Sequence, residues 1–470
     1  MTCSKDHREE PIVSRAPISL EDLSTRTGEP VATLNAWHEH GLIGKKDEDH
    51  FHVHDVGRTR LIHQLLHFGH SLEAVRDAIN KPNSVLGHFL DEMARQLSHP
   101  MFSIAEAVEI TGMDLTTMKT IVDATGIADH DMLDEDDLAC LRSIKVALDA
   151  NYPLEGLVQI LRVYADAMRR AAEVGQRTSH FYMHQPAQRE LPDSEVMDRL
   201  NQTFSQIEPM IEPALLYYYR KGNLQSAWDD MLMHLEEESG LAEKPEIPGQ
   251  IRRAIMFADL ASFTPLAEAM GDVKAAEIVA RFAEIVRVAN TRCHGRIVKQ
   301  IGDAFMVVFP ECYSALSCAL ELEQRASAEE QFPAVRVGLH YGPVLYREGD
   351  YIGSNVNIAS RLTEMANRHQ VLVSAEVRSR ARDLAGVEWI RIGKQRLKGL
   401  AAEVELYEAR PALVEPSGKA VDPVCGMEVG QREVAARLSL SGVDYSFCSD
   451  DCLRQFVRAP EKYTTPVPAE

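Results

Sequence analysis

The sequence predicts a multidomain chain with an all-α N-terminal half, an α+β domain and a small C-terminal module that contains cysteines. The first observation is length, since 470 residues exceed what one hydrophobic core usually supports. The second is periodicity: the first 240 residues repeat helical patterns, whereas residues 247–410 alternate apolar strands with helices. The third is that Cys425, Cys448 and Cys452 gather in the last 46 residues, after the linker PALVEPSGKA.

Composition excludes several classes of protein. A hydrophobic fraction of 45% and a charged fraction of 26% are ordinary for a globular protein. A formal net charge of −21 argues against a chain that coats nucleic acid or an anionic membrane. No run approaches the length of a membrane span, and MTCSKDHREEP lacks the apolar core of a signal peptide. We therefore expect a soluble, cytoplasmic protein with no membrane partner, whose eight cysteines are mostly thiols.

The N-terminal half contains an internal repeat. Residues 18–44 and 102–129 share apolar spacing and a Thr-Gly turn, at Gly28 and Gly112. Each is followed by a polar patch, a further helix and a Leu-Glu helix start, at Leu72 and Leu154. Gly between two short apolar-periodic stretches is typical of a helix-turn-helix. We predict two related helical units, the first of which resembles the winged helix-turn-helix of the MerR family and forms a domain over residues 17–85.

Charge argues against DNA as the partner of this first unit. Residues 31–38, where a recognition helix would lie, contain no Arg or Lys. Residues 17–80 contain 6 Lys and Arg against 10 Asp and Glu, a net charge of −4, so counterion release would contribute little. We expect an interaction or sensor module.

If residues 49–55 form the strand of the wing, the side chains of His50, His52 and His54 share one face of that strand. There they either bind a metal ion or protons, or are simply solvated.

Residues 100–240 read as helix after helix and are predicted to form a second helical domain, which includes the second repeat. Their aromatic cluster is predicted to be ordinary packing core between helices. The cluster consists of Tyr217, Tyr218, Tyr219 and Trp228.

Residues 247–410 predict strands and helices in the order β-α-α-β-β-α-β, which describes a ferredoxin-like α+β sandwich. The first strand ends at Asp259, and residues 296–309 form a hairpin whose turn contains Asp303. Carboxylate oxygens at two such positions suit Mg²⁺ or Mn²⁺. The next residues, Leu260 to Thr264, lead into a helix whose free N–H groups could cradle a phosphate.

Four further residues recur at fixed spacing. Lys299 stands four before Asp303, Asp350 stands seven before Asn357, and Arg361 stands four after Asn357. Residues 250–410 resemble the catalytic domain of a class III adenylyl cyclase. The residues named above fill every position of the catalytic set of that family. Residues 100–240 resemble the helical regulatory domain that precedes some soluble bacterial members of this family.

The resemblance implies the conversion of ATP to 3′,5′-cyclic AMP and pyrophosphate at two metal ions per site. It implies Asp259, Leu260 and Asp303 as metal-binding residues, and Phe263, Thr264 and Lys398 as contacts to the triphosphate. Arg361 would stabilise the transferring phosphate and Asn357 would orient the ribose. A Lys donor with an Asp acceptor complements adenine, so Lys299 and Asp350 would select ATP.

In this family the two metal-binding carboxylates and the base, ribose and phosphate residues come from opposite protomers, which implies a homodimer. A guanylyl cyclase is the nearest enzymatic alternative. The alternative of another class is a non-catalytic transcription or metal-sensing regulator that uses the cyclase fold as a dimeriser.

The last segment, residues 420–466, resembles a YHS domain through AVDPVCGMEV and YSFCSDDCLRQF. Cys448 and Cys452 are four residues apart and share a helical face, and Cys425 could approach them. Three thiolates form a candidate second metal site, for Zn²⁺ or another thiophilic ion such as Cu⁺. Buried thiols that pack a small core are the alternative.

Overall fold

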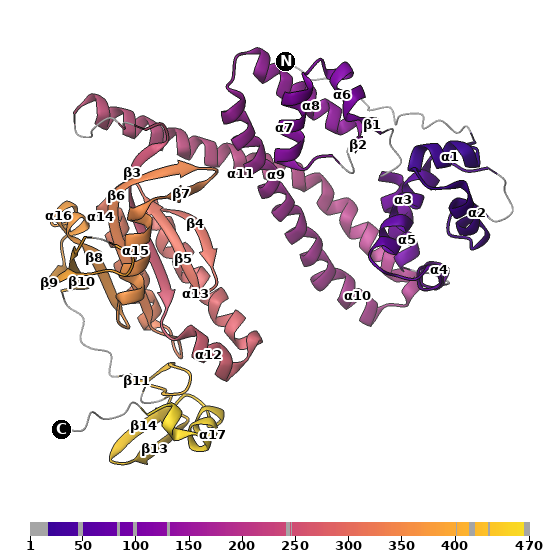
Figure 1. The fold of residues 1–470 in the computed structure, drawn as a ribbon. Helices are drawn as coiled ribbons and strands as arrows, with labels where there is room; N and C mark the ends of the chain where they lie inside the picture. Colours follow the sequence, from indigo (N-terminus) through magenta and orange to yellow (C-terminus); the bar gives the residue numbers. More distant parts are fainter. Residues whose placement is uncertain are drawn as a thin grey trace. The chain divides into compact units, whose positions relative to one another are not determined.

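The computed structural model describes residues 17–45, 50–81, 85–96, 101–128, 132–240, 245, 247–400, 402–412, 419–430 and 433–464. The chain divides into two compact units, Met1–Gln225 and Ser226–Glu470. Figure 1 shows the helices of the first and the sheet of the second. Within the described ranges, no helix combines the length and the apolar character that crossing a membrane requires.

The first unit contains the predicted repeat. Helices α1 (Leu20–Thr27) and α2 (Val31–Glu39) are separated by Gly28 at φ 75°, and α6 (Ile104–Thr111) and α7 (Leu115–Thr125) by Gly112 at φ 68°. A left-handed residue that ends the first helix of each pair explains the choice of glycine. In both copies a serine side chain caps the first helix. The two helix pairs therefore start and turn in the same way.

The helices that follow also correspond. The first copy continues with α3 (Val53–His67), α4 (Leu72–Ile79) and α5 (Val85–Gln96), and the second with α8 (Glu135–Asp149) and α9 (Leu154–Ser179). A bridge between Ile18 and Phe51 in the first copy corresponds to the strand pair β1 (Phe102–Ser103) and β2 (Met132–Leu133) in the second.

The predicted wing strand at residues 49–55 is wrong. Residue 49 lies outside the described residues, only Phe51 makes a β-bridge, and α3 begins at Val53 with His52 as its N-cap. The His50 and His52 rings still lie 5.4 Å apart and the His52 and His54 rings 5.7 Å apart, because the chain turns into the helix there.

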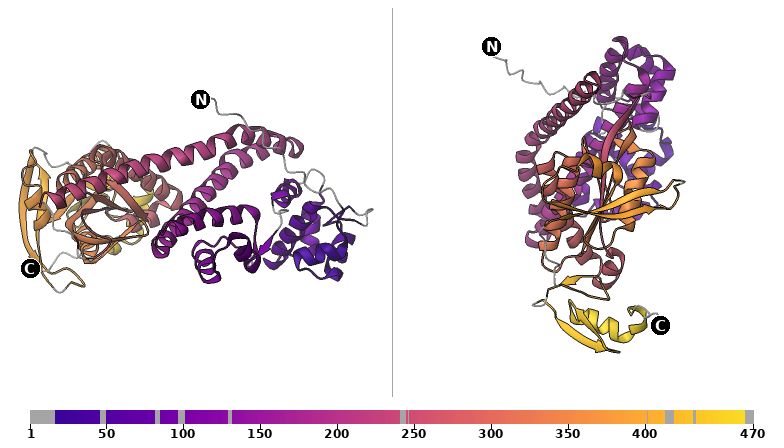
Figure 2. Two further views of the ribbon diagram at one scale, coloured as in Figure 1. Left: turned by 90° about the horizontal axis from the view of Figure 1, so that it is seen from above. Right: turned by 90° about the vertical axis from the view of Figure 1, so that its left-hand side faces the viewer.

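Helix α9 is followed by a π-helical turn, η1 (His180–His184), α10 (Gln185–Glu190) and the 46-residue helix α11 (Asp193–Glu238). The two long helices α9 and α11 can be followed in Figure 2. The predicted packing of the aromatic cluster is wrong for a single chain. Tyr217, Tyr218, Tyr219 and Trp228 are 56%, 71%, 53% and 56% exposed, because α11 meets a neighbouring helix along only part of its surface, as at the Tyr164–Tyr219 ring contact.

The main sheet of the second unit has the strand order β4-β5-β3-β6-β8-β10-β9, in which β7 also pairs with β6. The strands are β3 (Gln250–Leu260), β4 (Arg296–Ile301), β5 (Ala304–Phe309), β6 (Val335–Arg347), β7 (Asp350–Ile352), β8 (Gln370–Ser374), β9 (Val387–Gln395) and β10 (Val404–Pro411). The helices are α12 (Phe263–Met270), α13 (Asp272–Cys293), α14 (Cys312–Ala328), α15 (Ser354–Met365) and α16 (Ala375–Arg380).

Alternation along β3 divides the core of this sheet into two. Ala254, Met256 and Ala258 belong to the cluster formed with α13 and α14, whereas Ile255 and Phe257 belong to a second cluster that includes Ala359 of α15. Successive side chains of a strand point to opposite faces, so helices cover both faces of the sheet. The predicted ferredoxin-like α+β sandwich is confirmed.

The C-terminal module consists of β11 (Ala420–Val421), β12 (Glu428–Val429), the hairpin β13 (Ala436–Leu440) and β14 (Val443–Phe447), α17 (Asp450–Arg458) and η2 (Pro460–Lys462). Most of the predicted linker lies outside the described residues. Phe447 and Phe456 are fully buried, with ring centroids 5.2 Å apart. Their apolar cluster is continuous with that of α13 and α14, so the module packs against the sheet domain.

Candidate active site

Two carboxylates meet at the end of β3. The antiparallel register pairs Ala258 with Phe305, which places Asp259 beside the turn that carries Asp303. Burial, together with a hydrogen bond and the like charge of Asp259, raises the pKa of Asp303 to about 7. Arg336 Nη2 donates to Asp259 Oδ2 at 2.6 Å. Two adjacent carboxylates repel each other, and a bound cation would remove this repulsion. The pair therefore suits Mg²⁺ or Mn²⁺, which prefer oxygen ligands.

The chain then turns sharply into α12. Leu260 is buried in the core, and Ser262 has φ 63°, a left-handed conformation that is uncommon for a residue other than glycine. Helix α12 begins at Phe263, so the N–H groups of Phe263 and Thr264 belong to its first turn. The first N–H groups of a helix have no partner within the helix and attract anions.

Lys299 and Asp350 form an ion pair between β4 and β7. Asp350 Oδ1 also accepts a hydrogen bond from the N–H of Tyr351 at 2.8 Å, which fixes its carboxylate. Both side chains are only partly buried, so a ligand can reach them. The structure therefore brings together the two residues predicted to read the base, although they are 51 residues apart in sequence.

Asn357 and Arg361 lie on α15, on the side away from the buried residues Ala359 and Leu362. Asn357 is exposed, and Arg361 Nη1 donates to Glu364 Oε1 at 2.6 Å. Lys398 is exposed in a turn after β9. Within the described part of one chain, the polar contacts of Arg361 go to Glu364, and those of Asp259 go to Arg336 and Asp303. A single chain does not join these two groups of predicted residues.

Contacts that the sequence did not reveal fix the position of α15. A Cβ atom on Gly338 of β6 would lie 2.4 Å from the N atom of Thr363, so only glycine permits this approach. Thr363 Oγ1 donates to the carbonyl of Phe257 at 3.2 Å. At the other end of the helix, His340 bridges Ser374 Oγ and Asn355 Oδ1, each at 2.8 Å. A glycine inside a predicted strand was the one available signal of close approach.

The C-terminal module brings its three thiols together. The Sγ atoms of Cys425 and Cys448 lie 3.5 Å apart, and those of Cys448 and Cys452 lie 3.7 Å apart. Ligands at the Zn–S distance of about 2.3 Å are separated by roughly 3.8 Å in a tetrahedron, so this spacing fits a thiolate-bound ion. Hydrogen bonds from Cys425 and Cys448 lower the pKa of Cys452, which lies in the first turn of α17.

Asp422 completes this cluster and was missed from the sequence. It offers a carboxylate oxygen within 4.8 Å of the thiol ligand atoms. Its oxygens also accept hydrogen bonds from the N–H groups of Val424 and Cys448, each at 2.8 Å. The buried carboxylate therefore holds the two thiol-bearing segments together.

Comparison with known protein families finds a match for three regions of this chain. Residues 250–408 match the adenylate and guanylate cyclase catalytic domain, residues 18–81 the MerR HTH family regulatory protein, and residues 420–467 the YHS domain. A pH-sensitive adenylate cyclase of Mycobacterium tuberculosis is 29% identical over 66% of this chain and 78% of that protein. An adenylate cyclase of Glutamicibacter nicotianae is 34% identical over 40% of this chain and 48% of that protein.

Among solved structures, an adenylyl cyclase from P. aeruginosa aligns with 35% of this chain and 98% of its own, at 22% identity and a TM-score of 0.31. By its family matches, this chain carries an adenylate and guanylate cyclase catalytic domain at residues 250–408, between a MerR-type helix-turn-helix and a YHS domain.

Proposed function

We propose that this chain is an adenylyl cyclase that converts ATP to 3′,5′-cyclic AMP and pyrophosphate as a homodimer. The ion pair of Lys299 and Asp350 is the observation that supports ATP as the substrate. Adenine presents an acceptor at N1 and a donor at N6, which an ammonium and a carboxylate complement, whereas guanine presents the opposite polarity at both positions. The cyclase relatives named above are also adenylate cyclases.

The reaction joins the ribose 3′ oxygen to the α-phosphate with departure of pyrophosphate. Asp259 and Asp303 would hold divalent cations, which supply charge neutralisation and activation of the hydroxyl. The N–H groups of Phe263 and Thr264 would bind phosphate oxygens. Arg361 would stabilise the negative charge that grows on the α-phosphate, and Asn357 would hold the ribose in line for attack.

Two features support a homodimer. Asn357 is exposed and Arg361 is partly exposed on α15, where Arg361 contacts Glu364, so both side chains can meet ATP that is bound at Asp259 and Asp303 of a second protomer. Helix α11 also exposes an apolar stripe at heptad spacing that ends at Leu235, 15 residues before β3 begins at Gln250. Such a stripe fits a two-helix coiled coil with a second copy of the chain. The stripe consists of Tyr217, Leu224, Trp228, Met231 and Leu235.

The dimer is tested by changing this stripe. The double variant Leu224→Glu and Leu235→Glu should sediment as a monomer and lose cyclase activity, since it places four carboxylates in the seam of each dimer. Val174→Glu is a control, because Val174 is an exposed apolar residue on α9. A double variant that stays dimeric and active would show that α11 does not form the interface.

The activity itself is tested by one assay. The purified chain is incubated with ATP or GTP and with Mg²⁺ or Mn²⁺, and the product is identified by chromatography and mass. Cyclic AMP from ATP is expected. Cyclic GMP from GTP, in place of cyclic AMP from ATP, would assign the chain to the guanylyl alternative, and no cyclic product would favour a non-catalytic dimeriser.

We further propose that the terminal modules regulate this activity and that the YHS domain binds a thiophilic ion. Cys425, Cys448 and Cys452 lie at separations that suit Zn²⁺ or Cu⁺. Titration of the full chain with Zn²⁺ should show one high-affinity ion that Cys448→Ser and Cys452→Ser remove. Equal binding by Cys140→Ser and wild type is the control, since Cys140 lies exposed on α8. Full binding by the cluster variants would contradict the site.

A further inference from the structure

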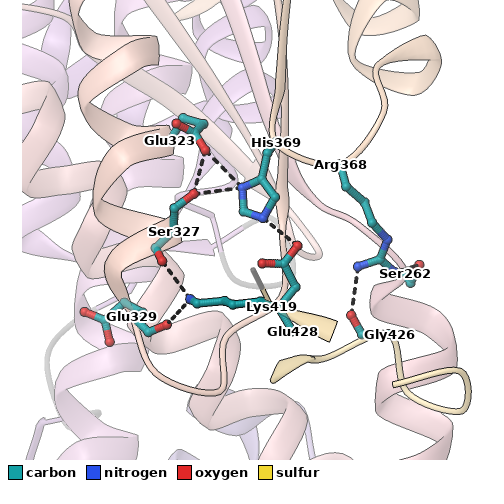
Figure 3. Close-up of polar contacts among 9 residues, drawn as sticks. All are labelled: Ser262, Glu323, Ser327, Glu329, Arg368, His369, Lys419, Gly426 and Glu428. Atoms are coloured by element: carbon teal, nitrogen blue, oxygen red, sulfur yellow. Dashed lines mark hydrogen bonds and ion pairs between the residues drawn. The ribbon is translucent and has the colours of Figure 1, made fainter. Parts of the chain in front are cut away.

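The YHS domain contacts the cyclase domain through the loop between α15 and β8 (Figure 3). Arg368 Nη1 donates to the carbonyl of Gly426, and its Nη2 donates to Ser262 Oγ, each at 2.8 Å. In the next residue, His369 Nε2 lies 2.6 Å from a carboxylate oxygen of Glu428. A single guanidinium therefore joins the YHS domain to the turn that precedes α12.

Further contacts show that this is an extended docking surface. Lys419 Nζ donates to the carbonyls of Ser327 and Glu329, at 2.7 and 3.1 Å (Figure 3). Gln455 of α17 donates to the carbonyl of Ala269, the last residue but one of α12. Beside these polar contacts, Met427 belongs to the same buried apolar cluster as α13 and α14. Apolar burial together with several hydrogen bonds favours one fixed orientation of the module.

Ser262 is the residue of the turn before α12 that Arg368 contacts at this surface. Its φ of 63° is unfavourable for a residue with a Cβ atom, so neighbouring contacts must hold it there. Its side chain does not cap α12, although it stands at the N-cap position. The hydroxyl accepts the hydrogen bond from Arg368 instead. The direction of the N–H groups of Phe263 and Thr264 follows from this residue.

The YHS backbone approaches Ser262 as closely as glycine allows. Gly426 has φ 73°, and a Cβ atom on it would lie 2.8 Å from both Ser262 Cβ and Arg368 Nη2. The preceding residue is Cys425 of the thiol cluster. Any added atom at position 426 must therefore move either the turn or the guanidinium.

We infer that the docked YHS domain clamps Ser262 through Arg368 and thereby sets the phosphate-binding turn of its own protomer. Arg368 is a positioning residue, because it touches Ser262 and Gly426 and acts on the substrate only through them. The inference rests on the proposed function, in which Phe263 and Thr264 bind the triphosphate. It assigns to the YHS domain a direct effect on the affinity for ATP.

The test compares two glycines of the YHS domain in the full chain. Gly426→Ala and Gly442→Ala carry a similar backbone penalty, since the residues have φ 73° and 81°, but the Cβ at 442 meets nothing within 4 Å. Gly426→Ala should raise hydrogen exchange in residues 260–270 and raise KM for ATP roughly three- to tenfold, the effect of losing one hydrogen bond, with a smaller change in kcat. Gly442→Ala should leave both at the wild-type value.

Arg368→Ala and Ser262→Ala provide a second route that adds no atom to the interface. Both should reproduce the exchange and KM effects. Equal exchange in residues 260–270 for Gly426→Ala and Gly442→Ala would refute the clamp, and raised exchange at unchanged KM would refute its effect on ATP binding. If the wild-type chain forms no cyclic AMP, the proposed function fails, while the exchange comparison still decides whether the clamp exists.

Discussion

Mixing two inactive variants of this chain tests whether its half-sites lie on opposite protomers. Asp303→Ala removes one of the two carboxylates that meet at the end of β3, and Arg361→Ala removes the guanidinium group from α15. Each homodimer then has the same defect in both of its sites and should be inactive. Both side chains lie outside the apolar clusters of the sheet, so we expect both variants to fold.

The expected recovery follows from counting sites. Random exchange makes about half of the dimers mixed, and each mixed dimer has one site with both defects and one with neither, so the activity should reach about one quarter of the wild-type rate per total protein. The assay measures cyclic AMP after the two variants have been unfolded and refolded together, with dimer formation checked by sedimentation.

A matched control uses two changes in the same half-site. Asp259→Ala mixed with Asp303→Ala should recover nothing, because each site of the mixed dimer then lacks one of the adjacent carboxylates. Recovery in this control, or no recovery from Asp303→Ala with Arg361→Ala despite mixed dimers, would refute the division of the site between protomers.

Three further changes have defined outcomes. Lys299→Ala should lower kcat/KM for ATP roughly 10- to 100-fold, the effect of losing a charge-assisted hydrogen bond, and reduce discrimination against GTP; unchanged discrimination would separate Lys299 from base selection. Gly338→Ala should cost about 1–3 kcal/mol of the free energy of unfolding, measured with urea, and lower activity because it displaces α15. Burial disfavours the charged form of His369, but hydrogen bonds with Glu323 and Glu428 outweigh it and raise its pKa to about 9. Because the folded pKa exceeds the unfolded value, this stabilisation is complete below about pH 6.5 and is lost as the pH rises through about 9. The midpoint temperature of thermal unfolding of the full chain should fall over that window, and Glu428→Gln should flatten this pH dependence; an equal slope in both would contradict the assignment.

Local sequence determined much of the architecture. Gly28 and Gly112 marked the helix pairs because each ends a helix in a left-handed conformation. A continuous apolar run from Ala254 to Ala258 marked β3. The structure buries the two faces of this strand in different clusters. The same patterns were ambiguous where one short apolar stretch could begin a helix or form a strand, as at His52 and His54, and there the predicted strand was wrong.

For the cyclase domain, sequence spacing singled out Lys299, Asp350, Asp259 and Asp303 as a set, because the chemistry of the reaction restricts residue types. Spacing could not show which of them meet in one chain, since that depends on strand register and on the turn between β4 and β5. The pKa of Asp303 is likewise a property of burial beside Asp259.

Only the tertiary structure decided how the cysteines and the cyclase domain are related. The sequence placed Cys425 and Gly426 in a separate module, more than 150 residues from Ser262. Packing of the two domains brings Gly426 against Ser262 and places Arg368 between them. The reason is physical: hydrophobic patterns specify that a surface is buried, whereas the partner it is buried against is selected by shape and hydrogen bonding between segments that are distant along the chain.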